Sequence, residues 1–309
     1  MEFEHELTVI GGGAAGLSAG VALARSRRSV LVIDAGQPRN APAEGVHNFL
    51  TRDGIAPREL VEEGRTEVRH YGGEVLDGRV AAAERTDDGF TVVLDDGARL
   101  TARRLVITSG VVDEFPDIDG LRDQWGRGVL HCPYCHGWEV RDQAVGVIAS
   151  SAASVHQALL FSQLTSEITL VTHSFEPDEE SLRLLAGAGV TVRAGSVERV
   201  ETAGATIEGL RLDDGTLLRV SAVVVSPRSV ARSNLLTSLG IETVAHPSGF
   251  GDYVEVDAMG QSAVPGVYLA GNLTDIAVQV MGAAAAGTKA DAAVNADLVL
   301  TDAREKVVA

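Results

Sequence analysis

The sequence predicts an α/β protein built from two nucleotide-binding-type units. A strand–turn–helix–strand pattern with a glycine-rich turn opens the chain, and the same pattern returns in its second half. The chain has 309 residues, 45% of them hydrophobic, which is long enough for two domains with proper cores. Abundant alanine, glycine and valine with 4% aromatic residues suit closely packed layers of helices and strands.

The composition argues against several classes of partner. A net charge of -17 and a pI of about 4.8 disfavour nucleic acid and anionic membranes, although an acidic solvated surface explains the same charge. Met1 to Glu6 is acidic and does not begin a signal peptide, and Val9 to Ala24 is too short and glycine-rich to span a membrane. Two cysteines are too few for an extracellular disulfide framework. We expect a soluble, cytoplasmic protein.

The first unit carries a complete dinucleotide-binding pattern. A strand is expected at 7–10 and a helix at 17–25, followed by a second strand at 30–33 that ends at Asp34. Between the first strand and the helix, the glycines fit G-x-G-x-x-G at Gly11, Gly13 and Gly16. In this pattern they allow a tight turn, close approach of a pyrophosphate to the backbone, and close packing of helix on strand. Asp34 stands where a carboxylate accepts hydrogen bonds from ribose hydroxyls. The combination predicts a bound dinucleotide.

The rest of the first half supplies a loop, a helix and a hairpin. Residues 37–57 lack periodicity and are expected to form a functional loop, in which Arg39, Asn40, His47 and Asn48 either line a cofactor or are ordinary loop polarity. A helix is predicted at 58–71, strands near 74–75 and 80–82, and a hairpin from 90–94 and 99–107. Thr108-Ser109-Gly110 ends the last strand, where backbone again meets a cofactor.

Both cysteines lie in one stretch, His131-Cys132-Pro133-Tyr134-Cys135-His136-Gly137-Trp138. Cysteines at i and i+3 can close a small disulfide ring, and a helix start or a neighbouring imidazolium favours the thiolate, so a redox-active dithiol is the leading interpretation. There are three alternatives. A structural disulfide is disfavoured because so small a ring would constrain little of the chain. A zinc site is disfavoured because its four ligands would lie within six positions, whereas tetrahedral sites draw on two separated pairs; two inert buried thiols are the third alternative. No metal is expected. Tyr134 and Trp138 either wall a small apolar pocket or pack between domains.

The second unit repeats the scaffold but has lost the phosphate-binding chemistry. Strands are expected at 144–148 and 168–171, a helix at 152–163, and a second hairpin from 212–215 and 217–225. Placing Ile148 on Ile10 and Thr172 on Asp34 gives the same offset (148 - 10 = 172 - 34 = 138). The three glycines are then replaced by Ala149, Ser151 and Ser154, and no arginine for a 2′-phosphate follows Thr172. These changes argue against NADPH; the alternative is that the serines still tolerate a loosely held dinucleotide.

The tail completes the pattern. A strand is expected at 264–272, ending in the turn Gly271-Asn272, followed by Gln279-Val280 and an alanine-rich helix that reaches about Leu300. We interpret Val294, Leu298 and Leu300 on this helix as core residues.

With these motifs, the chain resembles the low-molecular-weight thioredoxin-reductase family of flavoproteins along nearly its whole length. The resemblance implies two Rossmann-like domains, each a three-layer ββα arrangement, with the second inserted into the first. It places an FAD-binding domain at 1–113 and 246–309, an inserted domain with the cysteines at 114–245, and a homodimer. The residues expected to bind FAD are Gly11, Gly13, Ala14, Ala15, Gly16, Asp34, Ala35, Arg39, Asn40, Asn48, Val80, Ser109, Gly110, Gly271, Asn272, Gln279 and Val280.

Departures from the reductases point to one subgroup. His136 replaces the acid that follows the second cysteine, the NADPH motif is missing, and Asn272 replaces an aspartate near the FAD ribityl chain while keeping an acceptor oxygen. The Cys-Pro-Tyr-Cys-His-Gly form resembles the dithiol oxidases of gliotoxin, holomycin and related disulfide natural products. That resemblance implies a small-molecule dithiol substrate and O2 as the electron acceptor.

The sequence therefore predicts an FAD-dependent dithiol oxidase. Cys132 is expected to be attacked by a substrate thiolate and Cys135 to face the flavin, a role that follows from the resemblance. His136 is the first candidate for general base and His131 the second. An NADPH-dependent disulfide reductase and a non-catalytic flavin redox sensor are the alternatives.

Overall fold

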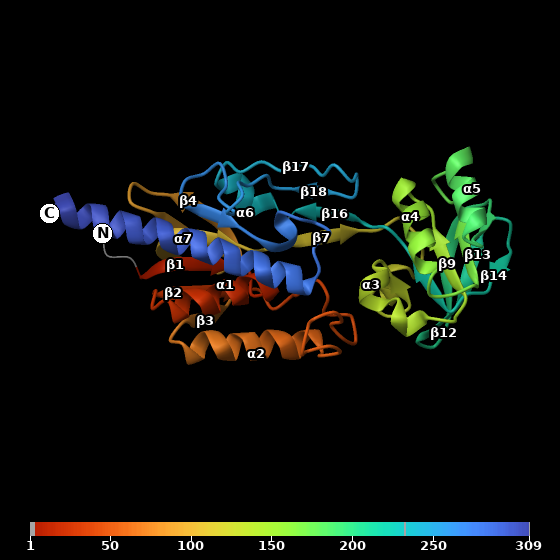
Figure 1. Cartoon of the computed structure of the whole chain (residues 1–309), viewed down its shortest axis with the longest axis horizontal. Coiled ribbons are helices and arrows are strands. Elements are labelled where there is room, and N and C mark those ends of the chain that lie inside the picture. Colours follow the sequence, from red (N-terminus) through yellow and green to blue (C-terminus); the bar gives the residue numbers. More distant parts are fainter. Residues whose placement is uncertain (1–3, 232, 309) are drawn as a thin grey trace. The chain divides into compact units, whose positions relative to one another are not determined.

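The computed structural model describes residues 4–231 and 233–308 and divides into two compact units. The first comprises Met1–Ala41, Ala56–Val112 and Ser229–Ala309; the second comprises Pro42–Ile55 and Asp113–Arg228. Both are α/β units with a parallel sheet, which confirms the predicted fold class (Figure 1). Within the described ranges, no helix is long and apolar enough to cross a membrane.

Parallel strands form the centre of the first unit. They are β1 (His5–Ile10), β2 (Val30–Asp34), β3 (Glu74–Asp77), β6 (Arg99–Ile107) and β19 (Val267–Leu269), and the sheet order runs β3-β2-β1-β6-β19. The start of β6 also pairs antiparallel with β5 (Phe90–Leu94), which pairs in turn with β4 (Val80–Arg85). The tail strand β19 thus joins the N-terminal strands in one sheet.

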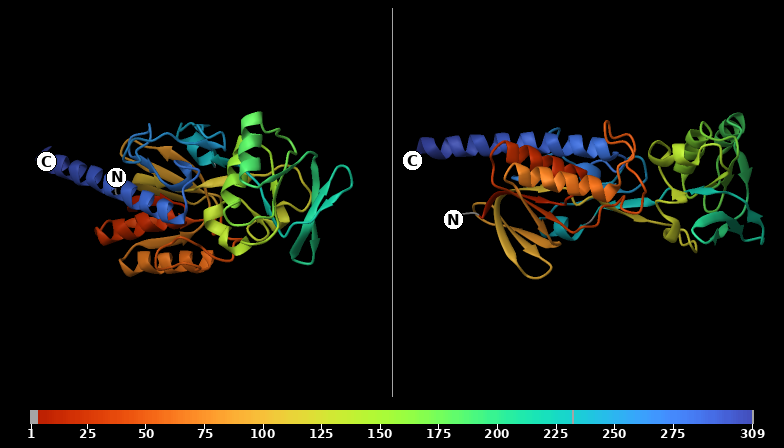
Figure 2. Two further views of the ribbon diagram at one scale, coloured as in Figure 1. Left: turned by 45° about the vertical axis from the view of Figure 1, so that its right-hand side comes forward. Right: turned by 90° about the horizontal axis from the view of Figure 1, so that it is seen from below.

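Side chains alternate between the two faces of this sheet, and each face packs against a separate layer. On one face, Leu7 and Val9 of β1 pack with Val32 of β2 under helices α1 (Ala14–Arg25) and α7 (Val280–Val308). Helix α2 (Pro57–His70) packs beside α1, and Figure 2 shows the three helices side by side.

On the other face of the sheet, neighbouring residues of the same strands, such as Ile10 and Ile33, pack against Phe90 and Val92 of β5. A sheet with helices on one face and a β-meander on the other is the expected ββα arrangement.

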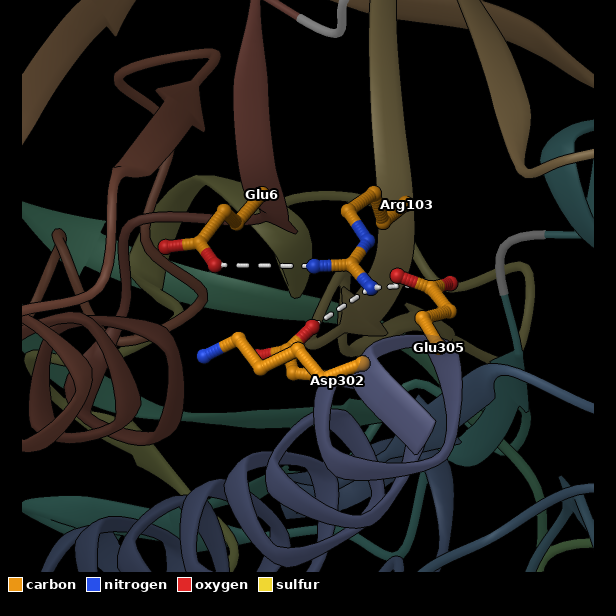
Figure 3. Close-up of a pocket in the computed structure, with 5 residues that line it drawn as sticks. Glu6, Arg103, Asp302 and Glu305 are labelled. Atoms are coloured by element: carbon orange, nitrogen blue, oxygen red, sulfur yellow. Dashed lines mark ion pairs between the residues drawn. The ribbon is translucent and has the colours of Figure 1, made fainter. Parts of the chain in front are cut away.

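The C-terminal end of α7 is held to the sheet by an ion-pair network. Arg28 lies 2.7 Å from Glu6 and 2.9 Å from Asp302, and Arg103 lies 2.7 Å from Asp302 and 3.7 Å from Glu6. Figure 3 shows Arg103 between these acids and Glu305 in a charged surface recess, which Lys306 also lines. Two arginines shared between acids of β1 and α7 hold the helix end in place by several charge-assisted contacts at once.

Helix α7 also corrects one sequence prediction. It continues to Val308, and Val294 and Leu298 are fully buried as expected, but Leu300 is 56% exposed. Residues 294 and 298 are four apart and share a helix face, whereas residue 300 is turned about 200° from residue 298 and faces solvent.

The second unit repeats the first. Its parallel sheet has the order β11 (Thr191–Arg193), β10 (Ile168–Val171), β9 (Val145–Ile148), β15 (Ala222–Val224) and β8 (Val129–Leu130). Helices α4 (Ala152–Phe161) and α5 (Glu179–Gly187) pack on one face. The other face packs on the meander β12 (Val197–Ala203), β13 (Thr206–Leu212) and β14 (Leu217–Leu218).

The strand registers confirm that the repeat has no gap. Ile10 pairs with Ile33 in the first unit, and Ile148 pairs with Val171 in the second. Both pairs of positions are therefore related by the offset that the sequence predicted, and Thr172 occupies the position of Asp34.

The second hairpin was predicted incorrectly. A single strand was expected at 217–225, by analogy with β6, but the structure divides it between β14 in the meander and β15 in the parallel sheet. The exposed Arg219 lies between the two, and Ser221 N donates to Ala144 O (2.8 Å) as the chain enters the other sheet.

The unit limits also differ from the predicted domain limits of 1–113, 114–245 and 246–309. The second crossing falls at 228/229, because Leu235, Leu236 and Ile241 around helix α6 (Ser233–Ser238) pack into the core of the first unit. Strands β17 (Val244–Ala245) and β18 (Asp252–Tyr253) follow in the same unit. The crossing segments β7 (Val111–Glu114) and β16 (Arg228–Ala231) pair with each other. Residues 42–55 belong to the second unit.

Candidate active site

The glycine turn after β1 is shaped to admit a ligand. Gly11 has φ +114°, and Gly11 N donates to Ile33 O (2.8 Å). A Cβ on Gly16 would overlap Gly11 O, whereas a Cβ on Gly13 would meet nothing within 4 Å. Gly11 and Gly16 therefore permit close packing of turn and helix. Gly13 leaves open space at the N-terminus of α1, where a phosphate is favoured.

Asp34 closes this turn from the end of β2. Its Oδ1 accepts from Gly12 N (3.3 Å) and Gly36 N (3.1 Å), and its Oδ2 accepts from Arg65 Nη2 (2.6 Å). Arg65 also lies 2.8 Å from Asp77. Burial alone would lower the pKa of Arg65, but its hydrogen bonds to the two aspartates outweigh burial and raise it. The carboxylate of Asp34 is therefore fixed in one orientation.

The C-terminal segment brings further expected residues to the same turn. A Cβ on Gly271, which has φ +77°, would lie 3.1 Å from the Cβ of Ala15, and one on Gly287 of α7 would overlap Ala15 O. Asn272 follows in the 3-10 helix Gly271–Leu273. Its amide nitrogen lies 3.0 Å from Val278 O and 3.3 Å from both Asp275 O and Ile276 O.

The remaining residues expected to bind the cofactor lie in the first unit, with the exception of Asn48. Ala14 lies in the first turn of α1, and Ala35 follows Asp34. Ser109 and Gly110 follow β6, Gln279 precedes α7, and Val280 is its first residue. Val80 begins β4 just after Gly78, whose N–H donates to Asp34 O. Arg39 donates to Ser229 Oγ (3.2 Å), and Asn40 follows it, half-buried. Asn48 is different: it lies in the second unit, where its amide donates to Tyr134 O (2.5 Å).

These residues fit FAD. The open space at Gly13 accommodates a pyrophosphate, and the oriented carboxylate of Asp34 suits a ribose. Ser109 Oγ is buried without a hydrogen-bond partner among the described residues, which a bound group beside the strand end would supply.

The equivalent turn of the second unit is filled by its own side chains. Ser154, at the position of Gly16, is fully buried, and its hydroxyl accepts from Ser150 N (3.1 Å). Thr172, at the position of Asp34, lies 3.4 Å from Gly195 N. Two hydroxyl side chains thus occupy the positions of Gly16 and Asp34 and are hydrogen-bonded within the second unit.

The cysteines lie at the start of a short helix in this second unit. Helix α3 (Pro133–His136) has Cys132 at its N-cap, and Cys135 N and His136 N lie 3.3 and 3.2 Å from Cys132 O. Both cysteines are half-buried. Because Pro133 fixes the first helical position, the helix holds the two cysteines one turn apart.

His136 is suited to accept a proton. Burial lowers the pKa of His136; the charge of Glu139 raises it and the charge of His47 lowers it. Its Nε2 is buried and has no hydrogen-bond partner among the described residues. At neutral pH the ring is therefore neutral and can act as a base.

Residues 42–55 are bonded to the cysteine helix. His47 Nε2 lies 3.4 Å from Glu139 Oε1 in the 3-10 helix Trp138–Val140, and its Nδ1 lies 3.4 Å from Asp53. Beside them, Tyr134 and Trp138 are 61% and 65% exposed, and the Arg141 guanidinium lies 4.1 Å from the Trp138 ring. Two exposed aromatic rings thus lie on the cysteine helix and on the 3-10 helix that follows it. Among the described residues, no group of acids, cysteines and histidines is arranged to hold a metal.

A nucleotide-binding turn in one Rossmann-like unit and a helical Cys-x-x-Cys pair in another define an oxidoreductase that handles thiols with the help of a dinucleotide cofactor. The chain belongs to the pyridine nucleotide-disulphide oxidoreductase family, whose model matches residues 5–290. The expected likeness to thioredoxin reductases is confirmed, and membership of the family implies a flavin.

Two relatives illustrate the likeness in sequence. The thioredoxin reductase tcpT of Claviceps purpurea is 32% identical over 307 residues, covering 94% of each chain. The thioredoxin reductase sirT of Leptosphaeria maculans is 29% identical over 305 residues, covering 93% of this chain and 92% of that one.

Solved structures show the same likeness. The crystal structure of HlmI is 41% identical and has a TM-score of 0.91, over 98% of this chain and 95% of that one. An oxidoreductase from Agrobacterium tumefaciens is 34% identical with a TM-score of 0.89, over 97% and 99% of the two chains.

Sequence reasoning missed two contributors to the site and the partner of a third. Arg65 lies in the middle of an amphipathic helix, where an arginine normally faces solvent, and only its burial reveals the pair with Asp34. The pairing of His47 with Glu139 depends on a loop without periodicity. Gln157 of α4 contacts His131, and no pattern links the two positions.

Proposed function

We propose that the protein is an FAD-dependent dithiol oxidase that closes a disulfide within a small-molecule dithiol, with O2 as the final electron acceptor and H2O2 as product. The observation that carries the proposal is the contrast between the two turns. At the first turn Gly13 leaves open space, whereas the second turn carries Ser151 at that position and the buried, hydrogen-bonded Ser154 at the position of Gly16. An oxidoreductase with a dithiol and one usable nucleotide site has little provision for NADPH.

The chemistry begins at Cys132. In the oxidised enzyme, in which Cys132 and Cys135 form a disulfide, a substrate thiolate attacks the Cys132 sulfur, the Cys132–Cys135 bond breaks, and its electron pair leaves on Cys135. The second substrate thiolate then attacks the substrate sulfur of the mixed disulfide, which closes the product disulfide and releases Cys132 as a thiolate. Two electrons pass from substrate to the cysteine pair, and two protons leave the substrate thiols.

The chain supplies the base for these steps. Burial keeps His136 neutral, so it can take a proton from a substrate thiol and later return one to a thiolate. Bound FAD would take the electron pair from the reduced cysteines and pass it to oxygen. The exposed rings of Tyr134 and Trp138 offer an apolar surface to a small substrate beside Cys132.

The relatives support the proposal in part. HlmI is the most similar of the structures described above, and the resemblance of the Cys-Pro-Tyr-Cys-His-Gly stretch is to dithiol oxidases. The names of tcpT and sirT favour the second candidate, an NADPH-dependent disulfide reductase.

Anaerobic mixing distinguishes the candidates. We expect a small dithiol such as dithiothreitol to bleach the flavin of the holoprotein and NADPH to leave it oxidised. Rapid stoichiometric bleaching by NADPH would establish the reductase instead. Under oxygen, we expect dithiol-dependent peroxide that Cys135→Ser abolishes; a protein that forms no peroxide with any of a panel of small dithiols would be a redox sensor rather than an oxidase.

A further inference from the structure

A hydrogen-bonded histidine lies at the carboxyl ends of the second unit's strands. His131 follows β8, Val225 follows β15, and Gln157 lies in the second turn of α4, the helix after β9. Val225 N donates to Leu130 O (3.0 Å), so the two strand ends lie side by side. In open α/β sheets this edge is where ligands bind.

Gln157 is the centre of this cluster. Its side chain is 94% buried, since 6% of its surface is exposed. Its amide nitrogen lies 2.9 Å from His131 O and 2.9 Å from His131 Nδ1, with Val225 O further away at 3.5 Å. The two amide hydrogens therefore have two near acceptors, both on the same histidine.

The opposite orientation of the amide is disfavoured. Exchanging the amide nitrogen and oxygen of Gln157 would place Oε1 2.9 Å from His131 O. Two carbonyl oxygens at that distance repel each other, because neither carries a proton to donate. In the orientation described, Oε1 is buried without a partner among the described residues, a cost that the two donated bonds offset.

The tautomer of His131 follows from this orientation. A proton on Nδ1 would point toward Val225 O at 3.3 Å, but it would also bring a ring N–H against the Gln157 N–H at 2.9 Å. Two donors at that distance repel each other, so Nδ1 acts as an acceptor and the ring proton lies on Nε2.

We propose that Gln157 is a positioning residue that holds His131 neutral in the Nε2–H tautomer, so that the residue before Cys132 acts as a hydrogen-bond donor and not as a base. The tautomer of His131 is inferred from the hydrogen bonds alone. The role of this tautomer in catalysis depends on the proposed dithiol oxidase function. There, an Nε2–H donor stabilises a thiolate formed at the cysteine pair, while His136 moves the protons. A helix that serves a nucleotide in the first unit thus serves the redox pair in the second.

NMR of the oxidised holoprotein labelled with [15N]histidine tests the tautomer directly. The nitrogen without a proton resonates far downfield of the one that carries it, and His131→Gln assigns the signals among the eight histidines. We expect His131 to carry its proton on Nε2 at pH 7. A proton on Nδ1, or a doubly protonated ring, would overturn the proposal without affecting the proposed function, because no turnover is measured.

Gln157→Glu supplies the second arm of the test. A carboxylate accepts where the amide donates, so we expect the proton to move to Nδ1 or the ring to become cationic. A cationic neighbour favours the Cys132 thiolate, so alkylation of the reduced protein by iodoacetamide at pH 6 should accelerate by about threefold for each unit by which the thiol pKa falls, because the thiolate fraction rises while its nucleophilicity declines.

Gln163→Glu, the same substitution at an exposed site just beyond α4, is the control and should change neither signal nor rate. Unchanged signals in a folded Gln157→Glu variant would also contradict the proposal. If that variant does not fold, the tautomer of the unsubstituted protein decides the question.

Discussion

Arg65 Nη2 lies 2.6 Å from Asp34 Oδ2 and 2.8 Å from Asp77 Oδ1, and Arg65 and Asp34 are both more than 90% buried. A buried ion pair is expensive to break, because removing one partner leaves an uncompensated charge. Here the surviving partner would be the carboxylate expected to bind the FAD ribose. The pair therefore links the stability of the first unit to its affinity for the cofactor.

We expect Arg65→Met to destabilise the protein by about 3–5 kcal/mol and to weaken FAD binding. Thermal unfolding measures the first effect, and titration of apoprotein with FAD measures the second. Arg65→Lys should recover part of both, since an ammonium is a point charge that cannot serve two carboxylates in the same plane. Arg69→Met, on the exposed face of the same helix, is the control. Normal FAD affinity in Arg65→Met would show that the pair serves stability alone.

The features predicted correctly from the sequence are those written in local patterns. The glycine turn, Asp34 at the end of β2 and the repeat offset all depend on neighbouring residues in the chain, so spacing alone reveals them. The degeneration of the second turn was visible for the same reason, because Ser154 is where a glycine would be.

The features that escaped prediction depend on pairs distant in sequence. Arg65 and Asp34 are 31 positions apart, and Gln157 and His131 are 26 apart. Nothing in either residue's own neighbourhood marks it as a partner. Likewise, the division of 217–225 between two sheets reflects competition between partners that only the folded chain brings together.

Asn272 differs from the aspartate usual in related flavoproteins, and its surroundings explain the difference. Its amide donates toward the carbonyls of Asp275, Ile276 and Val278, a set that a carboxylate cannot satisfy. We expect Asn272→Asp to cost about 1–3 kcal/mol and to raise the FAD dissociation constant roughly tenfold. Asn234→Asp at an exposed position is the control. Equal or tighter binding in Asn272→Asp would show that the carbonyls are not the reason for the asparagine.

His136 should set the acid limit of turnover. Because burial lowers its pKa below the usual 6.5, activity should persist to a more acidic pH than an exposed histidine allows. His136→Gln is expected to reduce kcat by about 10²–10⁴, the usual effect of losing a general base. The measurement is the pH dependence of kcat/KM for dithiol oxidation.

The two neighbours of His136 should shift this limit in opposite directions. Glu139 raises the pKa of His136, so Glu139→Gln should move the acid limb to lower pH. The charge of His47 lowers it, so His47→Gln should move the limb to higher pH. A limb that stays fixed in both variants would mean that another group titrates.

Asp291 of α7 should contribute less to stability at neutral than at acidic pH. It is 93% buried, since 7% is exposed, and burial raises its pKa from 3.8 to about 6. A folded-state pKa above the unfolded one gives stability that is complete below pH 3.8 and is lost as pH rises through about 6. Asp291→Asn should therefore raise stability at pH 8 by roughly 3 kcal/mol. The gain in Tm should shrink on acidification and vanish below pH 4, whereas the exposed Asp88→Asn should show no such trend. A gain that is independent of pH would instead reflect packing of the amide.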